Sequence, residues 1–394
     1  MSMVARVVAA VAVVVGGSGA LAQPCAGRWL PGNPVFNGAV NDIAEWNGGL
    51  AAVGNFTQVD GQPCAGIAVW DGESWAPYGP TTPTGNRRSV VEYNGLLVMD
   101  GMAVSSPWWV PMGAGLTFTT FTSMVVHNGE LYASGGYDSS LGSCVFKLTQ
   151  ATSPWRWLAV GNLGWNGTNS AARDLQVYNG KLVAVGTFPA PTQGQTPNIA
   201  EWNGTSWSSM GTVAFPNPPQ YLGVAEGQLF VSGSSFSGYL LSYDGSTWRT
   251  ELQNLSSPAV AVAEYDGAVY VGVGGRFMIR RGGVWGPSPV YLTSSGLPTM
   301  YDLVVHDGAL FVGGSFNGVA GAPAWNLSRY DVPGADFNGD GDLGTDADIE
   351  AFFACLAGDC CTDCWTGGAD MDGDGDLGTD GDIEAFFSVL AGGC

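Results

Sequence analysis

The acidic residues near the C-terminus form the clearest chemical pattern in the sequence. Segments 336–348 and 370–382 repeat nearly the same order of Asp and Gly, differing at Asn338 against Asp372 and at Ala347 against Gly381, and an Ile-Glu-Ala-Phe-Phe run follows each of them. A calcium loop requires oxygen ligands at its first, third and fifth positions, a Gly at the sixth and a backbone carbonyl at the seventh. We therefore predict two Ca²⁺ sites, with ligands from Asp336, Asn338, Asp340 and Asp342 and from Asp370, Asp372, Asp374 and Asp376.

A helix is expected after each loop, because apolar residues recur at i, i+3, i+4 and i+7, the spacing of one helix face. The predicted faces are Ile349, Phe352, Phe353 and Leu356 in the first copy and Ile383, Phe386, Phe387 and Leu390 in the second. We expect the two faces to bury each other, so that residues 334–394 form a small α-helical calcium-binding domain.

Two loop-plus-helix copies without entering helices resemble a dockerin, the calcium-dependent module that docks on cohesin modules in extracellular polysaccharide-degrading assemblies. By this resemblance Asp348 and Asp382, each directly before the Ile of its helix, close the loops, with Asp346 and Asp380 as the alternatives. The resemblance also implies which residues read the partner: Thr345 with Asp346, and Thr379 with Asp380. Dockerin helices usually carry basic residues and these have none, so the partner is either a cohesin-like module or a surface-sorting machinery.

Charge and hydropathy divide the chain into three parts. Residues 1–22 hold one basic residue, an apolar stretch and an Ala-Leu-Ala end, which predicts a secretory signal peptide cleaved after Ala22. The protein is therefore expected to be secreted or at the cell surface. Residues 334–394 contain 15 of the 34 acidic residues and none of the 13 basic ones, so 23–333 form a separate domain. A net charge of −21 argues against a nucleic acid partner, and no later apolar run is long enough to span a membrane.

A repeated turn organises residues 23–333. Its glycines are Gly48, Gly95, Gly129, Gly180, Gly227, Gly267 and Gly308. Asn-Gly or Asp-Gly flanked by β-branched and aromatic residues is the strongest local hairpin signal, because both turn positions need positive φ. A second phrase ending in Trp follows most copies, so each repeat predicts four strands. The repeat averages about 43 residues, close to the length of a propeller blade.

The predicted fold is therefore all-β: a seven-bladed β-propeller of four-stranded blades, closed by the N-terminal strand. The seventh copy lacks its last strand, whereas residues 27–32 read as a fourth strand with nothing before it. A ring closed in this way leaves no open sheet edge. With Gly-Gly pairs at 135–136, 274–275 and 313–314, the repeats resemble kelch-type and galactose-oxidase-like propellers, which host binding proteins and enzymes alike.

Residues 23–333 contain few candidates for catalytic residues. His127 and His306 occupy one repeat position that holds aromatics elsewhere, so we interpret them as repeat residues rather than copper ligands. No phosphate-binding loop, zinc-protease motif or serine-hydrolase elbow occurs in the mature sequence. A glycosidase needs only two carboxylates, which any two loops can supply. The acids outside the repeated turns are Asp60, Asp100, Asp138 and Asp174, each more simply read as a loop or turn acid.

Most tryptophans stand at fixed repeat positions, where we expect them to pack between blades with a partner for each N–H. Trp108, Trp109 and Trp165 fall outside that pattern. Packing is the simpler interpretation for these three as well, but exposed aromatics at the propeller mouth would suit a carbohydrate ligand.

The eight cysteines fall as three in the propeller (Cys25, Cys64 and Cys144) and five in the tail. Both numbers are odd, so either one disulfide joins the domains or each domain holds a free thiol. Export favours disulfides over the alternative, a zinc site at Cys361 and Cys364.

These observations predict a secreted, non-catalytic binding or display protein with a propeller interaction module and a calcium-dependent docking tail. One alternative is a polysaccharide-active enzyme, similar to glycoside hydrolases, delivered by the same tail. It would be favoured by two propeller carboxylates facing each other across the central mouth at roughly 5 to 10 Å. A purely structural surface-layer component is the third interpretation.

Overall fold

The computed structural model describes residues 28–29, 34–79, 87–100, 102–105, 108–112, 121–149, 155–163, 170–191, 196–233, 238–319, 322–331, 337, 345–358, 371 and 378–390. The chain forms two compact units. We call Arg28–Asp331 the ring unit and the described part of Val332–Cys394 the helical unit. Among the described residues, no helix has the length and apolar character needed to cross a membrane.

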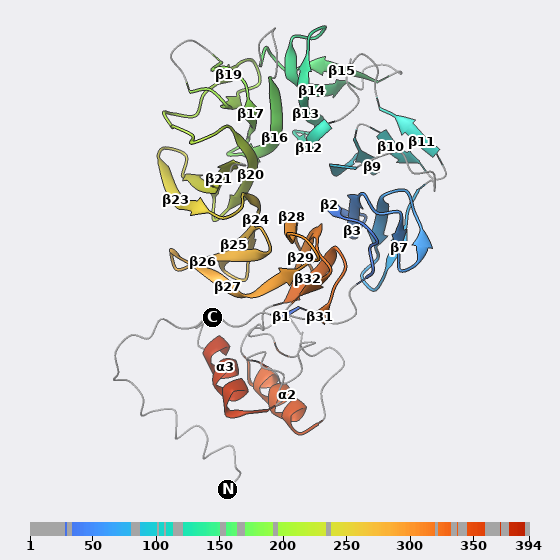
Figure 1. Ribbon diagram of the computed structural model, residues 1–394, viewed down its shortest axis with the longest axis vertical. Coiled ribbons are helices and arrows are strands. Elements are labelled where there is room, and N and C mark those ends of the chain that lie inside the picture. The colour runs from blue at the N-terminus through green and yellow to red at the C-terminus, as the bar shows by residue number, and fades with distance from the viewer. Residues whose placement is uncertain are drawn as a thin grey trace. The chain divides into compact units, whose positions relative to one another are not determined.

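Antiparallel four-strand meanders follow one another along the ring unit (Figure 1). The first four are β2–β3–β6–β7 (Val40–Trp46, Gly49–Gly54, Ile67–Trp70, Trp75–Pro77), β8–β9–β10–β11 (Val90–Tyr93, Leu96–Met99, Met102–Ser105, Trp108–Pro111), β12–β13–β14–β15 (Phe121–His127, Glu130–Asp138, Ser143–Thr149, Arg156–Ala159) and β16–β17–β18–β19 (Ala171–Tyr178, Lys181–Thr187, Ile199–Trp202, Trp207–Ser208). The next two are β20–β21–β22–β23 (Pro219–Ala225, Gln228–Gly233, Gly238–Tyr243, Trp248–Leu255) and β24–β25–β26–β27 (Ala259–Tyr265, Ala268–Val273, Arg276–Arg281, Val284–Thr293).

The last meander takes its fourth strand from the start of the ring unit. Its first three strands are β28 (Thr299–His306), β29 (Ala309–Ser315) and β32 (Leu327–Asp331). β1 (Arg28–Trp29) pairs antiparallel with β32, Trp29 standing opposite Tyr330, so the pairing that the sequence predicts is present. The first strand of each meander contacts that of the next, and β28 contacts β2, so the meanders close into a ring (Figure 1).

Two short hairpins complete the strands. They are β4 (Gln58–Val59) with β5 (Gln62–Pro63), and β30 (Gly318–Val319) with β31 (Ala322–Pro323). β30 also pairs with β27 of the preceding meander, Val319 standing opposite Leu292.

The repeated turn forms the predicted hairpins between the first and second strand of every meander. Both residues of each turn have positive φ; Asn47 and Gly48, for example, lie at 54° and 77°. Such turns match the twist of paired strands, which is why Asn, Asp and Gly prevail there. Glu226, at φ 47°, is the exception, because it stands at the turn position that Asn or Asp occupies in the other repeats.

The repeat tryptophans pack between neighbouring meanders as predicted. Trp157 and Trp207, on fourth strands, are 3% and 6% exposed. Their indole N–H groups donate to the carbonyls of Met112 and Val160, which directly follow the fourth strand of the preceding meander, at 2.6 Å. Each tryptophan therefore buries its ring and satisfies its donor across the same junction.

The helical unit contains α2 (Asp346–Leu356) and α3 (Asp380–Leu390). Phe352 and Phe386 are fully buried and stack with their ring centres 4.0 Å apart. The predicted face is wrong at Phe353, which is 37% exposed. It lies about 100° around the helix from Phe352, and the buried face instead includes Cys355.

The described cysteines behave differently in the two units. Cys64 and Cys144 are buried free thiols, and the Cys144 Sγ donates to the carbonyl of Leu163 at 3.1 Å. Cys355 is disulfide-bonded. The predictions for Cys25, Cys361 and Cys364 lie outside the described residues.

Candidate functional site

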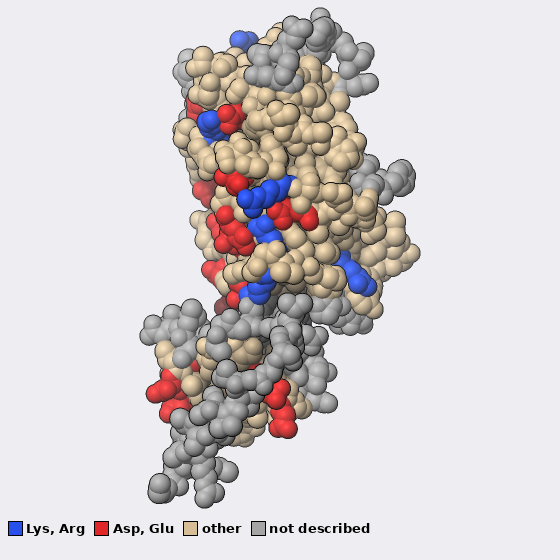
Figure 2. Space-filling view, turned by 90° about the vertical axis from the view of Figure 1, so that its left-hand side faces the viewer, with Lys and Arg blue, Asp and Glu red and all other residues tan. Residues whose placement is uncertain are grey.

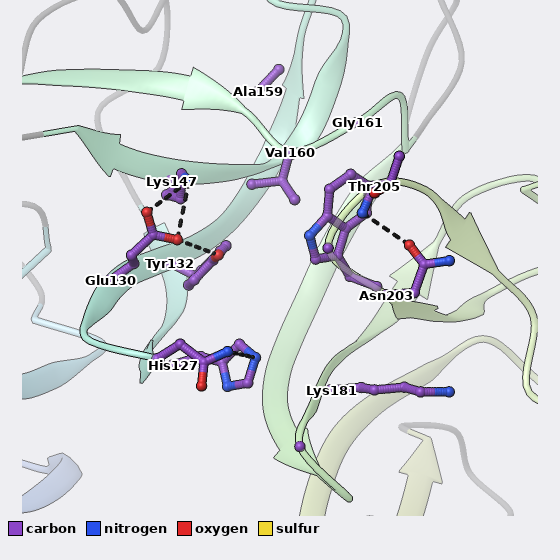
Figure 3. Close-up of a pocket in the computed structure, with 14 residues that line it drawn as sticks. His127, Glu130, Tyr132, Lys147, Ala159, Val160, Gly161, Lys181, Asn203 and Thr205 are labelled. Atoms are coloured by element: carbon purple, nitrogen blue, oxygen red, sulfur yellow. Dashed lines mark hydrogen bonds and ion pairs between the residues drawn. The ribbon is translucent and has the colours of Figure 1, made fainter.

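A pocket of about 570 Å³ lies between the β12–β15 and β16–β19 meanders (Figure 3). Glu130, Tyr132 and Lys147 lie on one side, and Asn203 and Thr205 lie on the other. These residues come from separate repeats, and only the packing of adjacent meanders brings them to one space.

Trp202, at the end of β18, forms the aromatic part of the lining. It is half-buried and packs on Trp207 with the ring centres 5.4 Å apart. Gly161 approaches this pair so closely that a Cβ there would lie 2.7 Å from the Trp202 ring, and its φ is +61°. A glycine is therefore needed where the β15 connection meets the two indoles.

Each lysine of this pocket is paired with a carboxylate. The Lys147 amine donates to both oxygens of Glu130 at 2.8 and 3.0 Å, and the Tyr132 hydroxyl donates to the same carboxylate at 2.9 Å. Lys181 donates to Glu201 at 2.8 Å. The hydrogen bond from Lys147 holds the pKa of Glu130 below its usual range, which favours the ionised form of this group.

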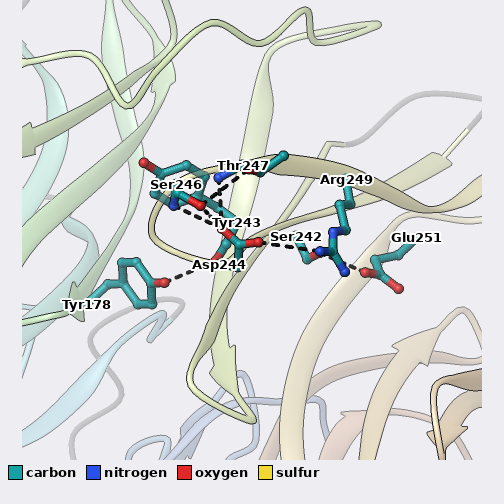
Figure 4. Close-up of polar contacts among 8 residues, drawn as sticks. All are labelled: Tyr178, Ser242, Tyr243, Asp244, Ser246, Thr247, Arg249 and Glu251. Atoms are coloured by element: carbon teal, nitrogen blue, oxygen red, sulfur yellow. Dashed lines mark hydrogen bonds and ion pairs between the residues drawn. The ribbon is translucent and has the colours of Figure 1, made fainter.

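Asn203 is held in a tight turn. Its side-chain oxygen accepts hydrogen bonds from the backbone N–H groups of Thr205 and Ser206, both at 2.9 Å. The same Asx-turn forms in the β22–β23 hairpin, where Asp244 accepts from Ser246 and Thr247 (Figure 4). The repeated acids and amides of the second hairpins therefore act as turn residues.

A second cavity, about 330 Å³, runs along the first strands of the meanders at the centre of the ring and contains Asp42, Asp174 and Asp302. Each of these acids follows a β-bulge in its strand. A bulge re-aims the next side chain. The carboxylates accept backbone N–H groups of the neighbouring first strand, from Val90, Leu222 and Ile43 respectively, at 2.7 to 2.8 Å.

Serines occupy the equivalent positions in two other meanders. The Ser89 hydroxyl accepts the N–H of Met124 at 3.0 Å, and the Ser123 hydroxyl accepts that of Leu175 at 3.4 Å. The acids of the central cavity therefore belong to a repeated contact between neighbouring meanders, which serine also provides.

The acids of the central cavity have raised pKa values, and burial is the main cause. It raises the pKa of Asp174 to about 6. Burial, followed by the charge of Asp302, raises the pKa of Asp42 well above its usual range, and the two carboxyls hydrogen-bond to each other. Asp174 also interacts by charge with Asp42 and Asp302, so the three carboxyls share one cavity.

Of the four acids that the sequence offered for catalysis, only Asp174 faces the central cavity. Asp60 lies in the β4–β5 turn and accepts the N–H of Val35 at 2.7 Å. Asp100 lies 3.7 Å from Arg87, with both side chains buried. Asp138 is fully buried in an Asx-turn, where it accepts the N–H of Ser140.

Sequence reasoning missed Asp42 and Asp302, although a signal was present. Asp42, Asp174 and Asp302 each stand six positions before a turn glycine of the repeat. Aligning the seven turns would have shown three acids in one column. His127 and His306 lie at the ends of β12 and β28, the shared repeat position that was predicted, and His127 also lines the pocket between meanders.

In the helical unit, Asp348 and Asp382 are fully buried at the starts of α2 and α3. Asp348 accepts the N–H of Phe337 and that of Thr345, both at 2.7 Å. Asp382 accepts those of Met371 and Thr379 at the same distances. Each carboxylate thus ties the second residue of its loop to the helix N-terminus, where the helix dipole favours an anion.

The role of Asp348 and Asp382 as closing ligands stays a prediction. The other predicted ligands lie outside the described residues: Asp336, Asn338, Asp340, Asp342, Asp370, Asp372, Asp374 and Asp376. Within the part of the chain that the structure describes, no three metal-ligating side chains converge. Trp165 and the side chains of Trp108 and Trp109 are likewise outside the description.

The ring unit is similar to solved β-propellers. The WD40 β-propeller domain of Doa1 aligns with a TM-score of 0.52 at 14% identity, covering 78% of this chain and 96% of that one. An extracellular domain of a one-component system from B. thetaiotaomicron aligns with a TM-score of 0.53 at 10% identity, covering 82% of this chain but only 42% of that one. Identities this low show the fold alone, a β-propeller. No family model and no curated protein matches the sequence.

Proposed function

We propose that the chain is a secreted, non-catalytic binding or display protein. In this proposal the ring unit is a seven-bladed, kelch-like propeller that binds a ligand, and the helical unit is a dockerin-like domain that docks a protein partner when it holds Ca²⁺. Residues 1–22 would direct export and be removed after Ala22.

The observation that carries the docking part is the equivalence of the two loop–helix copies. Asp348 and Asp382 are buried in the same way and hold Phe337 and Met371, the second residues of their loops, at the same distance of 2.7 Å. The hard oxygen donors of both loops suit Ca²⁺. The bound ion would supply positive charge among the loop acids. The loop ligands named above would hold it.

Two features weigh against the glycosidase alternative. The carboxylates of the central cavity accept backbone N–H groups from neighbouring strands, and those of Asp42 and Asp302 hydrogen-bond to each other. In the pocket between meanders, Glu130 is ionised and held by Lys147 and Tyr132. In both places the carboxylates already have protein partners, which weighs against their use as a free acid and base.

Calcium titration of the mature chain tests the proposal. Isothermal titration should show two sites, and replacing Asp336 and Asp340 together with Asn should leave one. Glu384→Gln, which removes an exposed acid of α3 outside the loops, should keep both. Capture of a protein from culture medium should then require Ca²⁺ and be lost in the double variant. No heat of binding, or capture unaffected by chelator, would contradict the docking function.

A further inference from the structure

The pocket between the β12–β15 and β16–β19 meanders combines an indole, uncharged hydrogen-bonding groups and compensated charge. We propose that it binds a neutral glycan, with one sugar ring against Trp202. This names the ligand class for the binding role of the ring unit, and so it rests on the proposed function.

Charge compensation is the first step of the argument. Lys147 lies at 2.8 and 3.0 Å from the Glu130 oxygens, and Lys181 lies at 2.8 Å from Glu201. A phosphate or a uronate would have to compete with these carboxylates for each ammonium group. An uncharged ligand leaves both ion pairs intact, and their remaining donor and acceptor positions can meet hydroxyl groups.

The uncharged lining supplies the matching surface. Sugar rings present C–H groups on their faces and hydroxyls around their rims. The indole of Trp202 offers an apolar face. Asn128, Asn203 and Thr205 place amides and a hydroxyl around the same space, with His127 beside them (Figure 3). Hydrocarbon ligands would leave these polar groups without partners, which disfavours them.

The pocket is already organised for a ligand. Trp202 is packed on Trp207, Gly161 sits against both rings, and Asn203 is fixed by two backbone donors. Groups fixed in this way lose little freedom on binding. The volume of about 570 Å³ falls within the range of small-molecule sites, roughly 300 to 1,000 Å³.

The first meander provides a matched control. Its β6–β7 hairpin has Trp70 and Trp75 in the places of Trp202 and Trp207, and their ring centres are 5.9 Å apart. Asp71 stands there in the place of Asn203 and makes the same turn, accepting the N–H groups of two following residues. Substitutions at Trp70 therefore test the packing role of this repeat position without touching the pocket.

The experiment applies the full mature chain to an array of neutral and uronic-acid oligosaccharides and then titrates the best neutral probe by tryptophan fluorescence. Trp202→Leu should lower affinity at least tenfold, and Trp70→Leu should leave it unchanged. Asn203→Asp keeps the turn, as Asp71 shows, but replaces an amide donor with a charge, and should also lower affinity at least tenfold.

Several results would overturn the proposal: no neutral oligosaccharide retained, retention of acidic glycans alone with affinity falling as salt rises, or equal losses in the Trp70 and Trp202 variants. Normal binding by Asn203→Asp would do so as well. Glycan binding should persist in chelator, because the described lining residues of the pocket all belong to the ring unit. Loss of calcium-dependent docking and loss of glycan binding are therefore separate outcomes.

Discussion

In five repeats the side chain six positions before the turn glycine joins a meander to its neighbour. Ser89 and Ser123 accept the neighbouring N–H as neutral groups, whereas Asp42, Asp174 and Asp302 do so with a carboxylate. A carboxylate is the stronger acceptor, but burying its charge is costly. The raised pKa of Asp174, about 6, records that cost.

Asp174→Asn should stabilise the ring unit at neutral pH and reduce its pH dependence. The folded state binds the proton of Asp174 more tightly than the unfolded state, whose Asp pKa is about 3.9. This group therefore favours folding at low pH, and the contribution is lost as pH rises from about 4 through about 6. The difference is at most roughly 3 kcal/mol at pH 7, from about two pKa units. An Asn oxygen can still accept the Leu222 N–H.

Denaturant unfolding at pH 5 and pH 7.5 measures this effect. Glu73→Gln, at an exposed turn acid, is the control and should leave the wild-type pH dependence unchanged. If Asp174→Asn and Glu73→Gln behave alike, burial of Asp174 has no energetic consequence.

Among the elements, hairpins were predictable because their information is local. An Asn-Gly or Asp-Gly turn needs positive φ at both positions, and those residues provide it wherever the repeat occurs. The inter-meander tryptophans were predictable for a similar reason, since a fixed repeat position implies a fixed environment. β1 could be assigned because the last repeat lacked a strand that the first residues of the mature sequence supplied.

The sites were less predictable because they depend on side chains from different repeats. The pocket joins Lys147 of β14 to Trp202 of β18, and nothing in either segment alone indicates the other. The contact between Asp302 and Asp42 joins the last and first meanders, the most distant pair in sequence. Phe353 shows a different limit: a periodic apolar stripe can be wider than the face that packing buries.

Removing residues 23–32 should destabilise the last meander. β1 would be absent, and the outer backbone of β32 would lose the pairing of Arg28 and Trp29 with Asp331 and Tyr330. An unpaired edge is a site for aggregation. We expect oligomers in size-exclusion chromatography and a melting temperature lower by at least about 3 °C, which corresponds to roughly 1 kcal/mol for a domain of this size. Deleting only 23–26 keeps β1 and should have neither effect; a monomer with unchanged melting in the longer deletion would refute closure by β1.

At the scale of the whole molecule, charge is handled differently in the two units. On the face of the ring unit in Figure 2, basic side chains lie beside acidic ones. Arg249 pairs with Asp244 at 3.6 Å, Arg280 with Glu226 at 2.8 Å and Arg281 with Asp266 at 2.9 Å. Residues 334–394 have 15 acidic residues and no Lys or Arg with which to do the same. A bound cation would reduce their mutual repulsion.

This contrast predicts two independent transitions in calorimetry of the full mature chain. Two Ca²⁺ ions would offset four of the 15 negative charges of residues 334–394, so added Ca²⁺ should raise the melting temperature of the helical unit, by linkage between binding and folding. Chelator should lower it by about 10 °C or more, because only the stacked Phe352 and Phe386 and the disulfide of Cys355 are then left to oppose the repulsion. The ring unit, whose first strands are joined by backbone hydrogen bonds to Asp and Ser, should melt at one temperature in both conditions. A shift of both transitions together would show that the units unfold as one, and no shift of either would show that the loops do not bind Ca²⁺.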